Sequence, residues 1–248
     1  GSPKAYLLSH IPGAGYIDTN RLEEEPLWNK VSDEALKALL LENGIRPFCT
    51  LYHWDLPYAL HLRGGWLSPD MPEWFANYTT IVADALGDRV KDFITINEPQ
   101  CIVGLGYQTG EHAPGLKVGP SDYFRIWHNV LKAHGRAVEA LREFSKQPVK
   151  ISMAPCGALY VPETNKPEDI EAARKANFSL PENSIGACSW DVALCCDPVY
   201  LGQYPEDILK EFGQFFPKVT DADMKLISQP LDFYGQNIYN AVTVRAGE

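Results

Sequence analysis

The chain has 248 residues, of which 45% are hydrophobic, enough for a sizeable core in one α/β domain or about two smaller domains. Its 32 acidic residues against 22 basic ones give a formal net charge of −10, and no run of Lys or Arg is present that could follow a phosphate backbone. The composition therefore argues against nucleic acid and membranes as partners, since no apolar stretch reaches the roughly 18 to 20 residues that span a bilayer.

The predicted strands are short apolar runs with β-branched or aromatic character, bounded by turn or polar residues. Such runs are typical of strands buried on both faces of a parallel sheet. Helical patterns lie between them, without a hairpin signal, which predicts repeated βαβ units and an α/β fold. In chain order the elements are a helix over 32–43, a strand over 45–52, a helix from Asp70, a strand over 90–96, a helix over 121–144, and strands over 149–154 and 231–238.

The helix from Asp70 has the clearest boundaries. Glu73, three residues after Asp70, predicts a capping box, and Pro72 suits the first turn. The pattern stops at Gly87. Its predicted inward residues are Phe75, Tyr78, Ile81, Val82, Ala85 and Leu86, and those of the 121–144 helix are Phe124, Trp127, Val130, Leu131, Ala137, Val138 and Leu141.

Cysteine usage predicts a reducing environment. The cysteines stand at positions 49, 101, 156, 188, 195 and 196, form no Cys-x-x-Cys pair, and lie mostly inside apolar runs. A chain of this length needs no disulfide framework, and neighbouring Cys195 and Cys196 would need a strained bridge. We therefore predict a cytoplasmic location.

Polar groups follow three of the predicted strands, where parallel α/β folds usually place their functional residues. Amide, imidazole and carboxyl groups beside aromatic rings are what a sugar site requires. Each of these residues also has a simpler interpretation: the His as a hydrogen-bonded structural residue, the Asn as a turn residue whose amide is hydrogen-bonded locally, and the Trp as a core residue. The residues are His53 and Trp54 after the first strand, Asn97 and Glu98 after the second, and Asn237 and Tyr239 at the last.

Seven strings follow one another along the chain, over roughly residues 44–240. They are TLYHWDLP from Thr50, GGWL from Gly64, FITINEP from Phe93, GYQTGEHAPG from Gly106, HNVLKAHGRAV from His128, DPVYLGQYP from Asp197 and DFYGQNIYN from Asp232. In this order they resemble family 1 of the glycoside hydrolases. The resemblance implies an eight-stranded (β/α)8 TIM barrel that hydrolyses β-glucosides and related β-glycosides with retention.

The resemblance also implies a role for each strand-end residue. Glu98 resembles the catalytic acid/base, and Asn97 the ligand of the sugar 2-hydroxyl, whose contact strengthens in the transition state. The remaining positions are substrate-binding by the same resemblance: His53 and Trp54 match the glycone pocket, Asn237 a sugar-pocket amide, and Tyr239 the phenol that contacts the nucleophile.

The sequence departs from the family in ways that predict a partial barrel. Retention needs a second carboxylate about 5–5.5 Å from the first, and the 248 residues contain no Thr-Glu-Asn-Gly string to supply it. Lys4–Tyr6 resembles the start of the family's second strand, but Leu7 stands where Arg is expected. We therefore expect one partial domain over 1–248 with about strands 2 to 6. Either a second chain, self-association or a longer protein would supply the rest.

The leading hypothesis is a retaining β-glucosidase-like enzyme for terminal β-D-glucosides, with its acid/base in this chain and its nucleophile outside it. The alternative is a non-catalytic half-barrel that binds carbohydrate or a protein partner. Glu98 favours the enzyme, because a pure binder needs no carboxyl at the glycosidic oxygen. A dinucleotide site fails on the spacing of Gly104, Gly106 and Gly110. We expect no cofactor and no metal, since no His/Cys/Asp cluster has metal-ligand spacing in the sequence.

Overall fold

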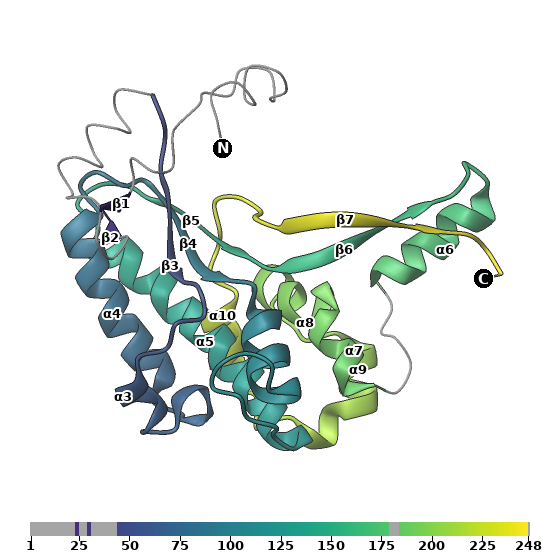
Figure 1. Cartoon of the computed structure of the whole chain (residues 1–248), viewed down its shortest axis with the longest axis horizontal. Helices are drawn as coiled ribbons and strands as arrows, with labels where there is room; N and C mark the ends of the chain where they lie inside the picture. The colour runs from purple at the N-terminus through teal and green to yellow at the C-terminus, as the bar shows by residue number, and fades with distance from the viewer. Residues whose placement is uncertain (1–22, 25–28, 31–43, 179–183, 248) are drawn as a thin grey trace. The chain divides into compact units, whose positions relative to one another are not determined.

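The computed structural model describes residues 23–24, 29–30, 44–178 and 184–247, in two compact units, Gly1–Phe48 and Cys49–Glu248 (Figure 1). In the first unit, strands β1 (Glu23–Glu24) and β2 (Asn29–Lys30) pair antiparallel. The helix predicted over 32–43 lies outside the described residues. The expectation of one domain over 1–248 stays a prediction.

A three-stranded sheet organises the larger unit, in the order β3 (Phe48–Tyr52), β4 (Asp92–Asn97), β5 (Lys150–Ala154). Strands β4 and β5 run parallel, with Phe93 opposite Ile151 and both side chains fully buried. The three strands predicted from apolar runs are thereby confirmed. A strand covered on both faces shows no alternation of buried and exposed residues, and β4 is buried almost throughout, polar Asp92 and Thr95 included.

The fourth predicted strand is displaced toward the carboxyl terminus. It was predicted over 231–238, but β7 spans Asn237–Val244. The residues before it still lie beside β5, where the Asp232 N–H donates to the Ile151 carbonyl at 3.0 Å and the Ile151 N–H donates to Asp232 Oδ2 at 2.9 Å. A side-chain carboxylate thus takes the place of a backbone partner, so no regular ladder forms there.

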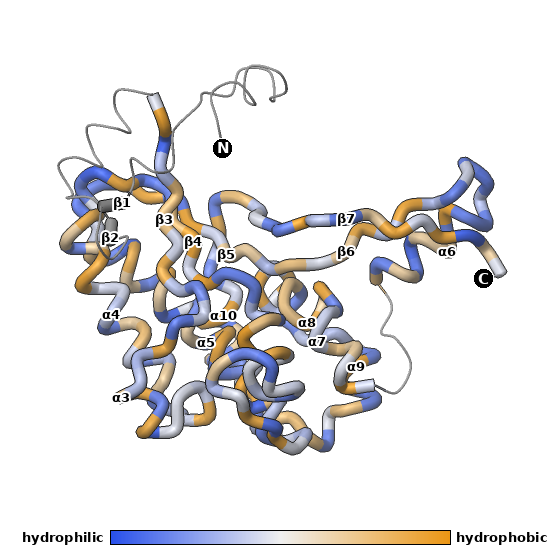
Figure 2. Tube along the Cα trace, in the orientation of Figure 1, coloured by the Kyte–Doolittle hydropathy of each residue, from blue (hydrophilic) through white to orange (hydrophobic). Residues whose placement is uncertain are grey.

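Strand β7 instead pairs in parallel with β6 (Cys156–Pro162), which lies in a segment where the sequence patterns predict no strand. Figure 1 shows these two strands extending together beyond the three-stranded sheet, with helix α6 (Pro167–Phe178) alongside. The turn between β6 and α6 is hydrophilic (Figure 2). We refer to β6 and β7 together as the ribbon.

Helix α5 (Pro120–Phe144) packs beneath the sheet and against α4 (Met71–Leu86). The prediction for α5 is confirmed, and its apolar face is fully buried at every predicted position: Phe124, Trp127, Val130, Leu131, Ala137, Val138 and Leu141. This helix therefore provides most of the core beneath the strands that carry the candidate site.

The predicted start of α4 is wrong in its capping. Asp70 has helical dihedrals, φ −84° and ψ −10°, and its side chain makes no cap hydrogen bond. Glu73 does not complete a capping box, because its carboxylate accepts a 2.7 Å hydrogen bond from Arg136 of α5. The hydrogen bond between Glu73 and Arg136 of α5 therefore takes the place of the predicted capping contact within α4.

The predicted inward stripe of α4 is also partly wrong. Tyr78 is 46% exposed and Ile81 is 69% exposed, whereas Thr79 and Ala83 are fully buried. The small Thr79 and Ala83 side chains suit a close approach to α5, and the Thr79 hydroxyl is satisfied by the Phe75 carbonyl at 2.8 Å. Hydrophobicity alone does not reveal which face permits that approach.

Short helices complete the larger unit, and all six cysteines are free thiols. None of the helices described in the structure is long and apolar enough to cross a membrane. The other helical segments are α3 (Tyr58–His61), η2 (Gly65–Leu67), the π-helical η3 (Cys101–Thr109), α7 (Ile185–Trp190), α8 (Val192–Cys196), η4 (Asp197–Leu201), α9 (Glu206–Phe212), η5 (Gly213–Phe215) and α10 (Asp221–Ile227).

Candidate active site

Glu98 is the centre of the candidate site. It directly follows β4 and is 4% exposed. Its Oε1 accepts hydrogen bonds from Asn237 Nδ2 at 2.7 Å and from the Tyr239 hydroxyl at 3.0 Å, and its Oε2 accepts one from Cys101 Sγ at 3.3 Å. The carboxylate is therefore held by groups from the ribbon on one oxygen and by the segment after β4 on the other.

Two non-glycine residues of the described chain have positive φ, and both are predicted site residues. They are Trp54, with φ 78°, and Glu98, with φ 42°. Such conformations cost about 1–3 kcal/mol each and persist where neighbouring contacts enforce them. Here the Glu98 N–H donates to the Ala154 carbonyl at 2.7 Å, and Trp54 Nε1 donates to the Asn97 carbonyl at 3.0 Å.

The Asn97 amide connects groups from three strands. Its Oδ1 accepts from Asn237 Nδ2 at 3.0 Å, and its Nδ2 lies 3.4 Å from His53 Nε2. Since the amide nitrogen is a donor, this contact selects the imidazole tautomer whose Nε2 accepts. The structure thus joins all six predicted residues in one hydrogen-bonded network with Glu98 and Asn97 at its middle.

A cavity of about 510 Å³ opens beside Glu98, within the usual size range of small-molecule sites. Of the six predicted residues, Glu98 and Tyr239 line it, together with aromatic Trp190 and Tyr160. Trp54 lines a second cavity of about 200 Å³ instead. The larger cavity offers a carboxyl, a phenol and aromatic surface, a combination suited to a sugar or its aglycone.

Tyr239 contributes a phenol from an exposed position. Its side chain is 81% exposed, although its hydroxyl reaches Glu98. The hydrogen bond to the Glu98 carboxylate, and the negative charge there, raise the pKa of Tyr239. Its predicted contact with a nucleophile stays a prediction.

Three neighbours of Glu98 were missed by the sequence analysis: Gln100, Cys101 and Cys156. The Gln100 side chain donates to the Cys156 carbonyl at 2.9 Å and accepts from the Cys156 N–H at 3.3 Å. Hydrogen bonding with Cys156, followed by burial, raises the pKa of the Cys101 thiol. The only local signal in the sequence is the position of Cys101 three residues after Glu98, which is within one helical turn.

Solved structures show the same fold. A family 1 β-glucosidase from Thermotoga maritima in complex with isofagomine lactam superposes with a TM-score of 0.69 at 37% identity, covering 85% of this chain and 46% of that one. This superposition confirms the predicted fold class. The described sheet and helices are part of a (β/α)8 TIM barrel.

Sequence comparison gives the same answer. Beta-glucosidase A of Thermotoga maritima is 38% identical over 235 residues, which are 94% of this chain and 48% of the relative. Beta-glucosidase A of Acetivibrio thermocellus is 40% identical over 214 residues, which are 86% of this chain and 45% of the relative. The chain spans about half the length of these relatives. Residues 33–248 match glycosyl hydrolase family 1, and the chain belongs to that family.

Proposed function

We propose that this chain carries the acid/base half of a retaining β-glucosidase site that acts on terminal β-D-glucosides. One observation carries the proposal: the nearly buried Glu98 carboxyl lies directly after β4, on the wall of a cavity of about 510 Å³. The names of the relatives, which are β-glucosidases, support the reaction class.

In this mechanism Glu98 protonates the glycosidic oxygen as the leaving group departs. It then removes a proton from the water that hydrolyses the glycosyl-enzyme. The nucleophile is a second carboxylate, about 5–5.5 Å away. We propose that it comes from a strand outside these residues, which the half-length match to the relatives supports.

The surrounding groups bind and orient the sugar. We propose that Asn97 contacts the 2-hydroxyl, while His53 and Trp54 shape the glycone pocket. Asn237 holds both Asn97 Oδ1 and Glu98 Oε1, so it fixes these two groups relative to each other. Tyr239 is proposed to meet the nucleophile, and the exposure of its ring leaves room for that contact.

The remaining strands are proposed to come from a longer polypeptide, a complementing chain or a second copy. Apolar side chains of β7 support an added layer, since Ile238 is 50% exposed and Val242 is 39% exposed. The cytoplasm is proposed as the compartment, because all six thiols are free.

The test is hydrolysis of a chromogenic β-glucoside by the purified chain, alone and mixed with a polypeptide carrying the other half of the Thermotoga maritima barrel. We expect turnover only in the mixture. In it, Glu98→Gln should slow hydrolysis of alkyl glucosides by about 10²–10⁴-fold, the usual contribution of a placed proton donor.

Glu111→Gln is the matched control, since Glu111 is exposed and lies in the segment after Glu98. It should leave turnover unchanged. Hydrolysis by the chain alone would contradict a nucleophile outside these residues. An active mixture that is indifferent to Glu98→Gln would remove the acid/base assignment.

A further inference from the structure

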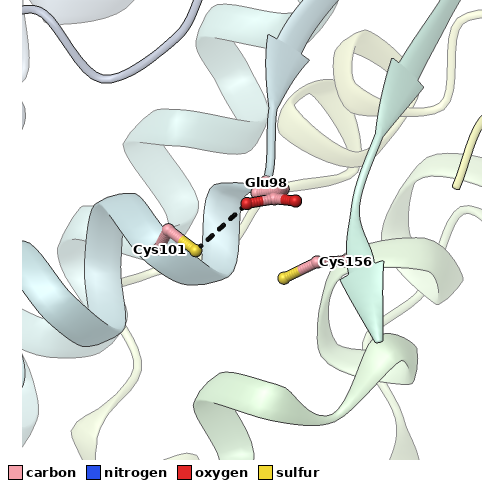
Figure 3. A group of neighbouring side chains, drawn as sticks. All are labelled: Glu98, Cys101 and Cys156. Atoms are coloured by element: carbon pink, nitrogen blue, oxygen red, sulfur yellow. Dashed lines mark hydrogen bonds between the residues drawn. The ribbon is translucent and has the colours of Figure 1, made fainter. Parts of the chain in front are cut away.

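Two thiols and the Glu98 carboxylate form a buried group at the site, which we call the thiol–carboxylate cluster: Glu98, Cys101 and Cys156. One carboxylate oxygen and the two sulfur atoms all lie within 4.8 Å of one another. Figure 3 shows both sulfur atoms directed into the space next to the carboxylate. Neither the acid/base role nor sugar binding accounts for a pair of thiols at this point.

The cluster is held in place by short contacts. Glu98 and Cys101 lie on one turn, where the Cys101 N–H donates to the Glu98 carbonyl at 2.9 Å. Cys156 begins β6, and the fully buried Gln100 amide binds both its N–H and its carbonyl. Cys156 is therefore fixed to the same turn that carries Glu98 and Cys101. Because the three side chains are already held together, less entropy is lost when they bind a common partner.

The spacing of the three atoms suits a small soft cation. Zinc binds thiolate sulfur at about 2.3 Å and carboxylate oxygen at about 2.0–2.2 Å, so tetrahedral geometry separates two sulfur ligands by about 3.8 Å. In the structure the three atoms lie within 4.8 Å of one another, and Cys101 Sγ is 3.3 Å from Glu98 Oε2. Only small side-chain movements would therefore bring them to the distances of a tetrahedral zinc site.

The two oxygens of Glu98 have different surroundings. Asn237 and Tyr239 both donate to Oε1, whereas the neighbour of Oε2 is the Cys101 thiol. Binding a cation through Oε2 therefore leaves the outer hydrogen bonds to Oε1 in place, and such outer contacts orient metal ligands. All three cluster residues line the cavity of about 510 Å³, which leaves a fourth position open to water.

We propose that the thiol–carboxylate cluster binds one thiophilic divalent cation of the zinc class, through Cys101 Sγ, Cys156 Sγ and Glu98 Oε2. Both thiols release their protons to solvent when the cation binds. The bound cation occupies the oxygen that would otherwise transfer a proton, so it inhibits hydrolysis. That inhibition rests on the proposed function, whereas cation binding does not.

The direct test uses the complete 248-residue chain, freshly reduced and freed of reductant. Zinc K-edge X-ray absorption of the chain with one equivalent of Zn²⁺ should show two sulfur ligands at about 2.3 Å, with oxygen completing the shell. This measurement needs no variant, so no substitution can disturb the fold. A shell without sulfur, or with more than two sulfurs, would overturn the proposal.

Cobalt titration of variants identifies the ligands. We expect Co²⁺ to produce a thiolate-to-metal charge-transfer band that saturates at one equivalent and that Zn²⁺ abolishes. Cys101→Ser and Cys156→Ser should each lose the band, while Cys196→Ser, which removes a thiol next to Cys195, should keep it. Circular dichroism should show that each variant used is folded.

A band that survives both cluster variants, or that disappears in folded Cys196→Ser, would contradict the assignment. In the active mixture, Zn²⁺ should inhibit wild type and Cys196→Ser but not a folded, active Cys101→Ser variant. If zinc binds through the three ligands but the mixture shows no turnover at all, the proposed function fails and the cation site stands.

Discussion

The core under the sheet and the ribbon differ sharply in burial, although both contribute to the Glu98 site. Phe93 and Ile96 of β4 are fully buried, whereas Ile238 and Tyr239 of β7 are 50% and 81% exposed. Glu98 thus directly follows a strand whose apolar side chains are fully buried. Two of its hydrogen-bond donors, Asn237 and Tyr239, come from the more exposed ribbon.

This difference indicates how the site is built. The strain at Glu98, with φ 42°, is held by β5 through Ala154, inside the core. The side chains of Ile238 and Tyr239 on the ribbon have no comparable layer over them among the described residues. The core therefore fixes the backbone of Glu98, whereas the groups that bind its Oε1 come from the more exposed ribbon.

The largest expected effect comes from removing a core side chain. Trp127→Ala should lower the free energy of unfolding by about 3–5 kcal/mol, because Trp127 is fully buried beneath the sheet. Val242→Ala on the ribbon should change it by no more than about 0.5 kcal/mol, as expected for surface positions. Urea unfolding of both variants measures the difference. Equal losses would remove the contrast between the two regions.

A smaller effect is expected from Asn237→Ala, which removes the donor shared by Asn97 and Glu98. Hydrogen bonds to charged groups are worth about 1.5–3 kcal/mol, so kcat/KM in the active mixture should fall by about 10- to 100-fold. Thr243→Ala, six residues along β7 and outside the cavity lining, keeps both hydrogen bonds and is the control. Similar losses in the two variants would show that the whole strand, not the Asn237 amide, is responsible.

The smallest effect concerns the titration of Tyr239. The Glu98 carboxylate raises the pKa of this phenol, because it accepts the hydrogen bond of the protonated hydroxyl and because ionisation would place two negative charges together. The contact therefore contributes fully below the ordinary tyrosine value of about 10 and is lost as pH rises through the raised value. Glu98→Gln should lower the pKa of Tyr239, measured by NMR of labelled tyrosine, with Glu111→Gln as control. An unchanged titration would mean that the contact is absent in solution.

Local patterns predicted the core well. The apolar run over 90–96 corresponds to β4, and all seven predicted inward positions of α5 are fully buried, although the helix also buries residues that were not predicted, such as Ile126 and Ala133. Strand β4 and the buried face of α5 are both covered by other parts of the fold. Hydrophobic composition and periodicity are therefore sufficient to predict them, without knowledge of the residues that cover them. The start of α4 was not predictable in the same way, because Glu73 meets Arg136, a residue distant in sequence.

The candidate site shows the same division. Glu98 was predictable as the residue after an apolar strand, and the family resemblance added its role. The strand β6 was not, since Gly157 and Pro162 weaken its pattern and its partner β7 lies far along the chain. Strand β6 and the Gln100 amide position Cys156 beside Glu98, although the two residues are far apart in sequence. Sequence spacing therefore did not reveal the thiol–carboxylate cluster.

The most direct test of the central claim is chemical rescue of Glu98→Ala in the active mixture, using an aryl glucoside whose leaving group needs no protonation. The glycosyl-enzyme should then accumulate, because no base activates water. Azide, already an anion, should attack the sugar carbon and release the nucleophile carboxylate, which restores turnover and yields β-glucosyl azide. Wild type should not respond to azide. Turnover of Glu98→Ala at the wild-type rate, without azide, would contradict the assignment of Glu98 as the acid/base.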